Sequence, residues 1–387
     1  SSDLSLSHLY VYLKPSMIKK INFQFLLSYF GLFPFLIILL DKFFFKFFDY
    51  NIVNDFAILY SIIIFVFIGA INWNLKKNIS FLIILIGFSP SLASVLIIIM
   101  FLNSYEIENL LNKGKIIKFN LLQVSFDIAC IKIKLDNDSE FIVKFDVKSK
   151  RVFNPIKSET KNLQYLNRKL NLFPKVINFN KNYLIIEFIK NNGKKPTNTN
   201  LDFLEATIKI HNITNNLYGF EFNTQIGALE QHNEFDNSWT NFYSSKRLNP
   251  IFELANTKEN MGDFINKKIN YLLKNIKNFI PDNPTPRLLH GDLWEGNIIF
   301  DNKNFVGFID PGSFYGHNEM EVAYLRWFNP PFVDLNFLQK YNEHININKN
   351  YLNYEPIYQL YYALCNVALW DNSYIKEVRR ALIKLKL

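Results

Sequence analysis

Cysteine is nearly absent from this chain, which has two among 387 residues, Cys130 and Cys365. They lie far apart in the sequence and form no Cys-x-x-Cys pair. This excludes a disulfide framework and a cysteine zinc site, and it fits a reducing compartment.

Glycine is also scarce, with 13 residues in the chain and none between Gly114 and Gly193. The net charge is +9, yet Lys and Arg are spread along the chain without an Arg-rich stripe or a known nucleic-acid-binding motif. We interpret the charge as ordinary solvated surface and membrane flanks, and we predict no nucleic-acid partner.

Long apolar runs dominate the first part of the chain, at 23–40, 56–73 and 79–102, and the third run holds no charged residue. A bilayer core needs about 20 apolar helical residues. Residues 18–102 are therefore predicted to form a transmembrane helical region that contacts lipid from about 23 to 102, with buried core helices as the alternative. Residues 1–17, which end at the plausible native start Met17, are expected to be a non-native or disordered start.

The membrane topology has two possible forms. With three simple spans, the lysines near the start of this region and at 76–77 would lie on the outer side of the membrane, and residues 103–387 would lie inside. That placement goes against the positive-inside tendency. A third segment that re-enters at Ser89–Ser91 would place them on the same side, and we prefer this form. Gly31–Pro34 and Phe67–Trp73 resemble motifs of a family of small bacterial inner-membrane proteins of unknown function, which implies a membrane location and no chemistry.

The strongest chemical signal is the segment His290–Phe300, in which Asp292 follows a His-x-Asp pattern and Asn297 comes five residues later. Phosphoryl transfer needs a carboxylate that accepts the proton of the attacking hydroxyl, and an amide oxygen that holds Mg²⁺ against the phosphates. Asp292 is the candidate base and Asn297 the candidate metal ligand. His290 is expected to brace the loop, and it is also a candidate substrate-binding residue.

A second carboxylate follows at Asp310, in Phe308–Gly312. The residues between form a predicted hairpin across 297–309, which returns Asp310 to Asn297. Asp310 is therefore predicted to be the second Mg²⁺ ligand, since this ion prefers hard oxygen ligands. An Asp-Pro-Gly turn without function is the alternative.

Lys144, on a predicted strand, is the candidate for the α- and β-phosphates of ATP. Glu159 lies on the apolar stripe of a predicted helix at 155–170, and a buried acid needs a partner, which Lys144 would supply. A solvated Lys and a helix-end Glu are the alternative. Ser125, in the segment expected to cover the phosphates, and Glu187, after the apolar strand 183–186, are further nucleotide-binding candidates. Since the covering segment lacks glycine, either Ser125 and the backbone suffice or nucleotide binding is impaired.

The order of elements predicts an α+β, two-lobed protein-kinase-like fold. Residues 116–146 alternate as a strand pair or small sheet with a turn at 136–139, and the chain is mostly helical from about 200. We assign 103–192 to the small lobe and 193–387 to the large lobe, both preceded by the α-helical membrane segment.

Residues 103–387 resemble the fructosamine kinase (ketosamine kinase) family, a branch of the aminoglycoside-phosphotransferase-like fold. The matching motifs follow one another in family order: Tyr218–Phe220, Ile226–Gly227, Gln231–Asn233, Trp239, Phe242, Arg247–Leu248, the Trp294-containing loop 290–297, Asp310–Glu321 and Leu360–Tyr361. Ser125 and Phe126 stand where the family has glycines, Glu321 stands where it has aspartate, and Tyr361–Asn366 lack an expected histidine.

The resemblance implies an enzyme that uses ATP and Mg²⁺ to phosphorylate the 3-hydroxyl of a sugar attached to an amine. The unstable product releases the amine, so the reaction repairs glycation of a small-molecule or protein-bound ketosamine. Trp294 is equally compatible with stacking on the sugar and with packing under the loop, and His211 is expected to be structural. With the membrane region, this predicts a bacterial inner-membrane protein whose kinase region faces the cytoplasm, in an oligomeric state left open.

Two alternatives remain. One is a kinase of another small hydroxylated or amino-sugar compound, because a fold does not define a substrate. The other is a catalytically weak, nucleotide-binding pseudokinase, which the intact residues Lys144, Asp292, Asn297 and Asp310 argue against.

Overall fold

The computed structural model describes residues 107, 111, 113–146 and 152–385. The chain divides into two compact units, Ser1–Asn109 and Leu110–Leu387, and almost all the described residues belong to the second. The predicted start at 1–17 and the predicted transmembrane region at 18–102 lie outside the described residues. Among the helices of the described part, none combines the length and the apolar character needed to cross a bilayer.

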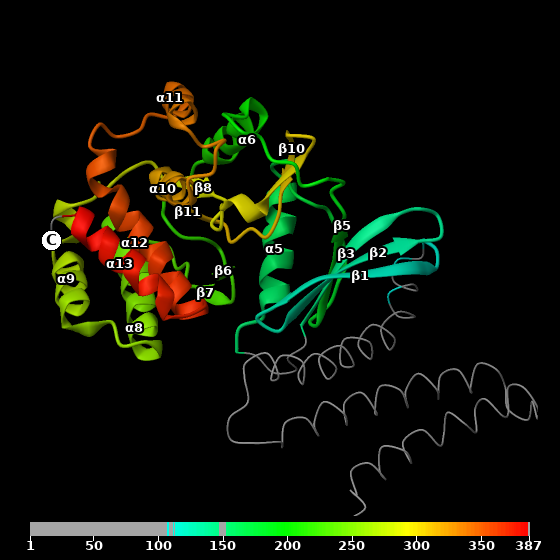
Figure 1. Cartoon of the computed structure of the whole chain (residues 1–387), viewed down its shortest axis with the longest axis horizontal. Helices are drawn as coiled ribbons and strands as arrows, with labels where there is room; N and C mark the ends of the chain where they lie inside the picture. Colours follow the sequence, from blue (N-terminus) through cyan, green and yellow to red (C-terminus); the bar gives the residue numbers. More distant parts are fainter. Residues whose placement is uncertain (1–106, 108–110, 112, 147–151, 386–387) are drawn as a thin grey trace, which may run out of the picture. The chain divides into compact units, whose positions relative to one another are not determined.

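The small lobe is an antiparallel five-stranded sheet with the order β1-β2-β3-β5-β4, accompanied by one helix (Figure 1). The elements are β1 (Ile116–Ser125), β2 (Ile128–Leu135), β3 (Glu140–Asp146), α5 (Pro155–Asn167), β4 (Val176–Phe179) and β5 (Tyr183–Glu187). The strand pair or small sheet predicted across 116–146 is thus three strands of a five-stranded sheet. The helix predicted at 155–170 ends at Asn167.

Helix α5 starts where local sequence chemistry favours it. The Asn154 side chain accepts a hydrogen bond from the backbone N–H of Lys157 at 2.8 Å, and Pro155 occupies the first helical turn. Both features stabilise a helix N-terminus. Leu163 and Leu166 are fully buried in the core that α5 shares with the sheet. This packing places Glu159, on the same stripe, behind the central strand β3.

The large lobe is mostly helical and carries short strand pairs (Figure 1). Its elements are α6 (Leu201–His211), β6 (Thr224–Ile226), β7 (Leu229–Gln231), α7 (Trp239–Tyr243), a π-helical turn (Ser244–Leu248), α8 (Asn249–Lys258), α9 (Gly262–Lys274), β8 (Arg287–Leu289), β9 (Ile298–Asp301), β10 (Asn304–Phe308), β11 (Phe314–Gly316), α10 (Asn318–Phe328), α11 (Leu335–His344), α12 (Tyr351–Leu369) and α13 (Ile375–Lys384). The hairpin predicted at 297–309 is β9 with β10, whereas the β6–β7 and β8–β11 pairs were not predicted.

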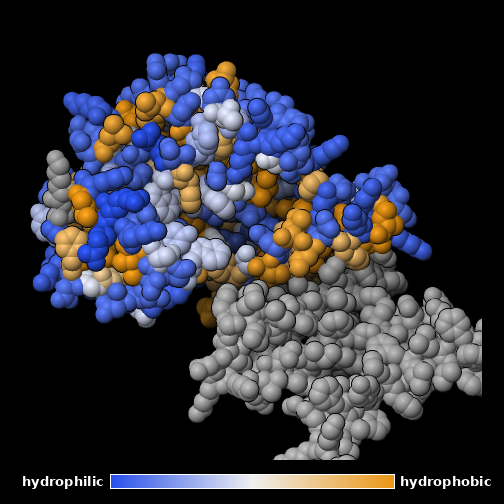
Figure 2. Space-filling view, in the orientation of Figure 1, coloured by the Kyte–Doolittle hydropathy of each residue, from blue (hydrophilic) through white to orange (hydrophobic). Residues whose placement is uncertain are grey.

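Aromatic side chains form much of the large-lobe core. Phe203 of α6 contacts the rings of Phe300, Phe308 and Phe337 from three other elements. Figure 2 shows mostly hydrophilic residues over the large lobe on this face, and a hollow between it and the sheet. The sheet exposes apolar side chains of β1, among them Ile117, Leu121 and Leu122.

Candidate active site

A buried ammonium group joins the two lobes. Lys144 Nζ lies 2.6 Å from Glu159 Oε1 on α5 and 2.5 Å from Asp310 Oδ1 in the large lobe. Burial alone would lower the pKa of Lys144, but the carboxylates of Asp310 and Glu159 outweigh it and raise the pKa above the ordinary value. The lysine is therefore charged. The predicted Lys144–Glu159 pair is present, and Asp310 extends it to three groups.

The sheet register holds this lysine in place. Lys144 pairs with Cys130 of β2 on one side and with Leu184 of β5 on the other. Cys130 is buried beside it, and this burial raises the pKa of its thiol to about 11, so the thiol stays protonated. A lysine on a central strand, paired with a carboxylate on the neighbouring helix, is the arrangement that kinases use to hold the ATP phosphates.

His290 links the candidate catalytic loop to the strand that leads to Asp310. Its ring is fully buried, and burial lowers its pKa, so the imidazole is neutral. Nε2–H donates to the backbone oxygen of Ile309 at 3.0 Å, and Nδ1 accepts from the backbone N–H of Asp292 at 3.3 Å. Because both ring nitrogens are engaged, the geometry favours the bracing role, and the substrate role of His290 stays a prediction.

Three further hydrogen bonds bring Asn297 and Asp310 together. Asn297 Nδ2 donates to the backbone oxygen of Asp292 at 2.9 Å, and Ile309 N–H donates to the backbone oxygen of Asn297 at 3.0 Å. Gly312 N–H donates to the backbone oxygen of His290 at 2.9 Å. Asp310 adopts a left-handed φ of 54°, a strained value for this residue type. The ion pair with Lys144 holds this carboxylate at the junction of the two lobes.

Asp292 lies at the centre of this loop. Burial and the nearby charge of Asp310 raise its pKa to about 7, although hydrogen bonds from the Gly227 backbone N–H and the Tyr324 hydroxyl oppose the shift. The Tyr324 hydroxyl lies 3.4 Å from Asp292 Oδ1, and its ring stacks on Tyr362 at 3.7 Å. A carboxylate whose pKa lies near neutral pH is suited to accept a proton during turnover. Sequence reasoning identified neither Gly227 nor Tyr324 as a partner of this group.

Glu321 of α10 holds the backbone of the loop 290–297. Its carboxylate accepts the backbone N–H of His290 at 2.9 Å and that of Gly291 at 2.7 Å, and it lies 2.9 Å from His211 Nε2. His211 is fully buried and also contacts the Tyr341 hydroxyl at 2.7 Å, so it is structural as expected. The sequence analysis named Glu321 only as a departure from the family motif. The sequence signal that could have revealed its role is an acidic residue within that motif.

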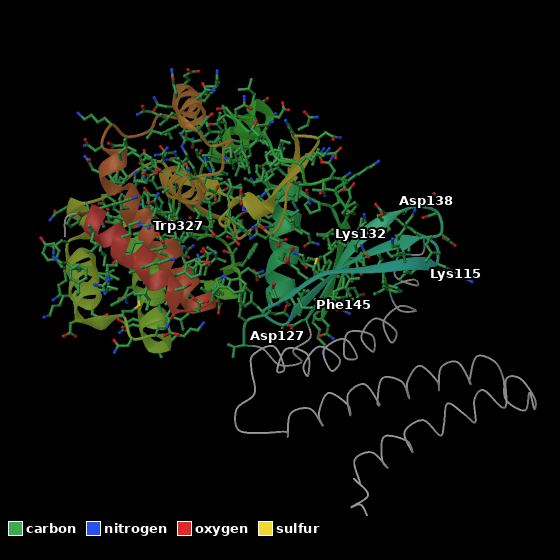
Figure 3. All side chains as sticks on the ribbon, in the orientation of Figure 1. Lys115, Asp127, Lys132, Asp138, Phe145 and Trp327 are labelled. Atoms are coloured by element: carbon green, nitrogen blue, oxygen red, sulfur yellow. The ribbon has the colours of Figure 1, made fainter. Side chains whose placement is uncertain are left out.

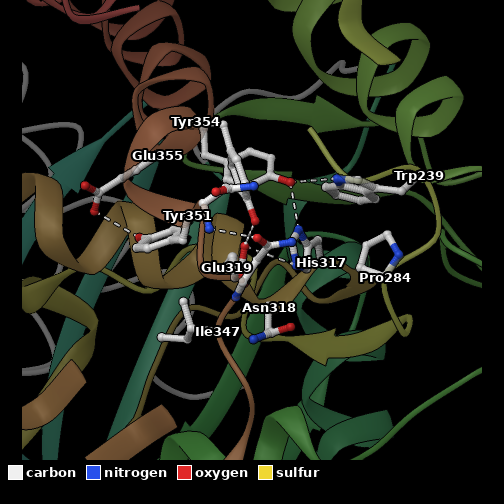
Figure 4. A network of polar contacts seen from close by, with 12 residues as sticks. Trp239, Pro284, His317, Asn318, Glu319, Ile347, Tyr351, Tyr354 and Glu355 are labelled. Atoms are coloured by element: carbon white, nitrogen blue, oxygen red, sulfur yellow. Dashed lines mark hydrogen bonds and ion pairs between the residues drawn. The ribbon is translucent and has the colours of Figure 1, made fainter. Parts of the chain in front are cut away.

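A second polar network supports the start of α10 (Figure 4). The Tyr358 hydroxyl accepts from Trp239 Nε1 at 2.9 Å and lies 2.8 Å from His317 Nδ1. Burial lowers the pKa of His317 to about 3, so its imidazole is neutral and carries its proton on Nε2, toward Glu319. The Glu319 carboxylate also accepts from the Tyr354 hydroxyl and, at 2.6 Å, from the backbone N–H of Asn348. These bonds fix α10, and with it Glu321, relative to α12.

The remaining predicted residues are Trp294, Ser125 and Glu187. Trp294 is half-buried, contacts the ring of Phe328 at 5.6 Å between centroids and lies over Gly296. Ser125 ends β1 at the turn into β2, and Glu187 ends β5 with an exposed side chain before the linker to α6. The structure brings together Lys144, Glu159, Asp292, Asn297 and Asp310, while roles for Ser125, Glu187 and Trp294 stay predictions.

The donor set at Asn297 and Asp310 fits a magnesium ion. Asn297 uses its Nδ2 on the loop backbone, which leaves the amide oxygen for a cation. One carboxylate oxygen of Asp310 pairs with Lys144, and the second oxygen is left for a cation. Both are hard oxygen donors, and Mg²⁺ commonly takes one or two protein ligands together with substrate phosphates. The described residues hold no group of three or more His, Cys, Asp or Glu side chains suited to a metal.

Known proteins resemble this chain in sequence and in fold. A model of the fructosamine kinase family matches residues 112–387. A protein of Enterococcus faecium assigned as a ketoamine kinase is 32% identical over 206 residues, which cover 52% of this chain and 70% of the relative. The chloroplastic protein-ribulosamine 3-kinase of Arabidopsis thaliana is 31% identical over 202 residues, which cover 50% of this chain and 58% of the relative.

The fold comparison agrees with the sequence comparison. A crystal structure of a protein from Thermobifida fusca, assigned as a fructosamine-3-kinase, superposes with a TM-score of 0.66 at 20% identity. The match covers 73% of this chain and 98% of that one. The predicted protein-kinase-like fold is therefore confirmed for the second unit.

The first prediction concerns Glu321. Glu321→Ala should lower the rate of ADP release from ATP by about 100-fold, because a loop displaced by about 1 Å misplaces Asp292. Glu321→Asp should keep activity within about tenfold, since it retains the carboxylate. Turnover and thermal unfolding should be measured together. A folded alanine variant with wild-type turnover would contradict the anchoring role.

The second prediction concerns pH. Because the pKa of Asp292 lies at about 7 and the base must be ionised, kcat/KM should fall as the pH drops through this value. Tyr324→Phe removes a donor to the carboxylate, so this acidic limb should move to higher pH and kcat/KM at about pH 6 should fall about two- to fourfold. Tyr243→Phe, which removes a buried hydroxyl that bonds Ile357, is the matched control and should leave the limb in place. An identical profile for all three proteins would refute the role of Tyr324.

Proposed function

The chain belongs to the fructosamine kinase family, and on this basis we propose that its kinase region transfers the γ-phosphoryl group of ATP to the 3-hydroxyl of a ketosamine. Members of this family are phosphotransferases that act on sugar hydroxyls. The observation that carries the proposal is the bridge from Lys144 to Glu159 and Asp310, with Asp292 and Asn297 on the adjoining loop.

The proposed reaction needs little covalent chemistry from the protein. The sugar hydroxyl attacks the γ-phosphorus, the bond to the bridging oxygen of ADP breaks, and the hydroxyl proton passes to Asp292. Lys144 would hold the α- and β-phosphates, and Glu159 keeps the ammonium in position. Asn297 and Asp310 would hold Mg²⁺, which when bound neutralises charge on the phosphates.

The substrate class rests on the relatives. Their names include ketoamine kinase, protein-ribulosamine 3-kinase and ketosamine-3-kinase, all of which denote sugars attached to an amine. Phosphorylation of such a sugar gives an unstable product that releases the amine, so we assign the chain to deglycation. Trp294 and Phe328 present aromatic surface beside the loop, and we propose that a sugar ring lies against them.

One observation favours a catalytically weak kinase as the second candidate. The β1–β2 turn contains no glycine, and its residues Phe126 and Asp127 carry side chains at left-handed φ values, so fewer backbone amides can approach a phosphate. The intact Lys144, Asp292, Asn297 and Asp310 favour the active form.

We also propose that the kinase region is held at the bacterial inner membrane, on its cytoplasmic side. The support is the sequence of residues 23–102, whose three apolar runs each approach or exceed the length of a bilayer span.

An acceptor test distinguishes the candidates. Coupled ADP-release assays should use the full chain with a fructosamine, with an aminoglycoside and without an acceptor. A ketosamine kinase should respond to the fructosamine, and Asp292→Asn should lower that response by at least about 100-fold. Glu295→Gln, on the same loop but partly exposed, is the matched control and should stay close to wild type. Activity with the aminoglycoside alone would favour another amino-sugar substrate, and no turnover with either would favour the weak kinase.

Fractionation tests the membrane proposal. The full chain, expressed in a bacterium, should sediment with the inner membrane and resist extraction by high salt, because apolar spans are released only by detergent. A shortened chain starting at residue 103 is the control and should lose this behaviour. Recovery of the full chain in the supernatant would exclude the membrane location.

A further inference from the structure

The turn between β1 and β2 has an unusual composition for its backbone. Ser125 pairs with Ile128 across the turn, and the two residues between them, Phe126 and Asp127, have φ values of 52° and 63°. Such left-handed values suit glycine and cost free energy for other residues. A bulky aromatic residue in this conformation needs compensating contacts elsewhere.

The turn reaches the large lobe. In Figure 3, Asp127 marks the end of the sheet that points toward the large lobe, whereas Lys115 and Asp138 mark the opposite end. The Phe126 ring lies 4.8 Å from the Trp370 ring between centroids, at an interplanar angle of 51°. Offset or tilted aromatic pairs at this separation attract one another beyond their buried area.

Trp370 is held in place although it is exposed. It follows directly after α12, and Lys258 Nζ donates to the backbone oxygens of Ala368 at 3.0 Å and Trp370 at 3.1 Å. About half of the residue's surface remains exposed, at 52%. Trp370 is therefore held at the surface, and we expect its replacement to leave the core intact.

Gly227 connects this contact to the candidate base. It lies in the β6–β7 turn with φ +55°, and a Cβ there would lie 3.0 Å from Leu369 Cδ1 and 3.7 Å from Phe126 Cε2. Its backbone N–H donates to the carboxylate of Asp292. The Phe126 ring at the tip of the small-lobe hairpin thus lies beside the Gly227 turn, whose backbone N–H donates to the candidate base.

We propose that Phe126 and Trp370 form an aromatic latch, which closes the β1–β2 hairpin onto the large lobe and presses the Gly227 turn against Asp292. The latch rests on the proposed function, because it requires a nucleotide beneath the hairpin. A glycine-rich loop closes through backbone amides on the phosphates, whereas this hairpin closes through a side-chain contact between lobes. ADP can then leave only after the ring contact breaks, so the latch slows product release.

Release of a fluorescent ADP analogue from the full chain tests the latch. After mixing with excess ATP, Trp370→Ala and Phe126→Leu should each release the analogue about three- to tenfold faster than wild type. Leu at 126 keeps an apolar side chain and the same backbone requirement, so it removes mainly the ring contact. The double variant should be no faster than the faster single variant, because both changes break one interaction.

Phe264→Leu on α9 is the matched control, because Phe264 is similarly exposed, at 42%, and lies in a different element. It should release the analogue at the wild-type rate. Unchanged release in both latch variants, or independent effects that multiply in the double variant, would overturn the latch, even if the melting temperature falls. A wild-type chain that binds no ADP analogue would overturn the proposed function and the latch with it.

Discussion

The Lys144 ammonium, buried between two carboxylates, is the interaction on which the candidate site depends. Glu159 comes from α5 and Asp310 from the large lobe, 166 residues away from Lys144 in the chain. A buried charge without partners is very unfavourable, and removing one partner of such a pair generally costs about 3–5 kcal/mol. The three groups therefore stabilise one relative arrangement of sheet, helix and Asp310 segment.

The large lobe prepares its half of the site in a similar way. Glu321 accepts the backbone N–H groups of His290 and Gly291, and the neutral His290 ring joins the loop to Ile309. Asp292 and Asp310 consequently lie close enough for the charge of Asp310 to raise the pKa of Asp292. Two neighbouring carboxylates repel each other, and a divalent cation bound to them and to the amide oxygen would relieve this repulsion. Since phosphoryl transfer depends mainly on positioning and electrostatics, this preorganisation is what the fold contributes.

The parts of the site predicted correctly from sequence were those set by short-range rules. The β9–β10 hairpin returns the chain beside its starting point, so the spacing of Asn297 and Asp310 sufficed to predict that they meet. Helical periodicity placed Glu159 with Leu163 on the inner face of α5, and its need for a partner pointed to Lys144. The bracing role of His290 was predicted, but its burial was not, because this burial depends on Phe173, which stacks on the ring from a distant segment.

By itself, the sequence predicted the kinase-like order of elements and the main acidic, amide and lysine residues, because these depend on local periodicity and spacing. The family was indicated separately, by motifs between Tyr218 and Tyr361 that resemble those of fructosamine kinases. Tertiary structure alone decided that Glu321 holds the catalytic loop, that Gly227 and Tyr324 contact Asp292, and that Phe126 contacts Trp370. Each of these contacts joins elements far apart in the chain. Their geometry follows from how whole helices and sheets pack, and no pattern within a single segment encodes that packing.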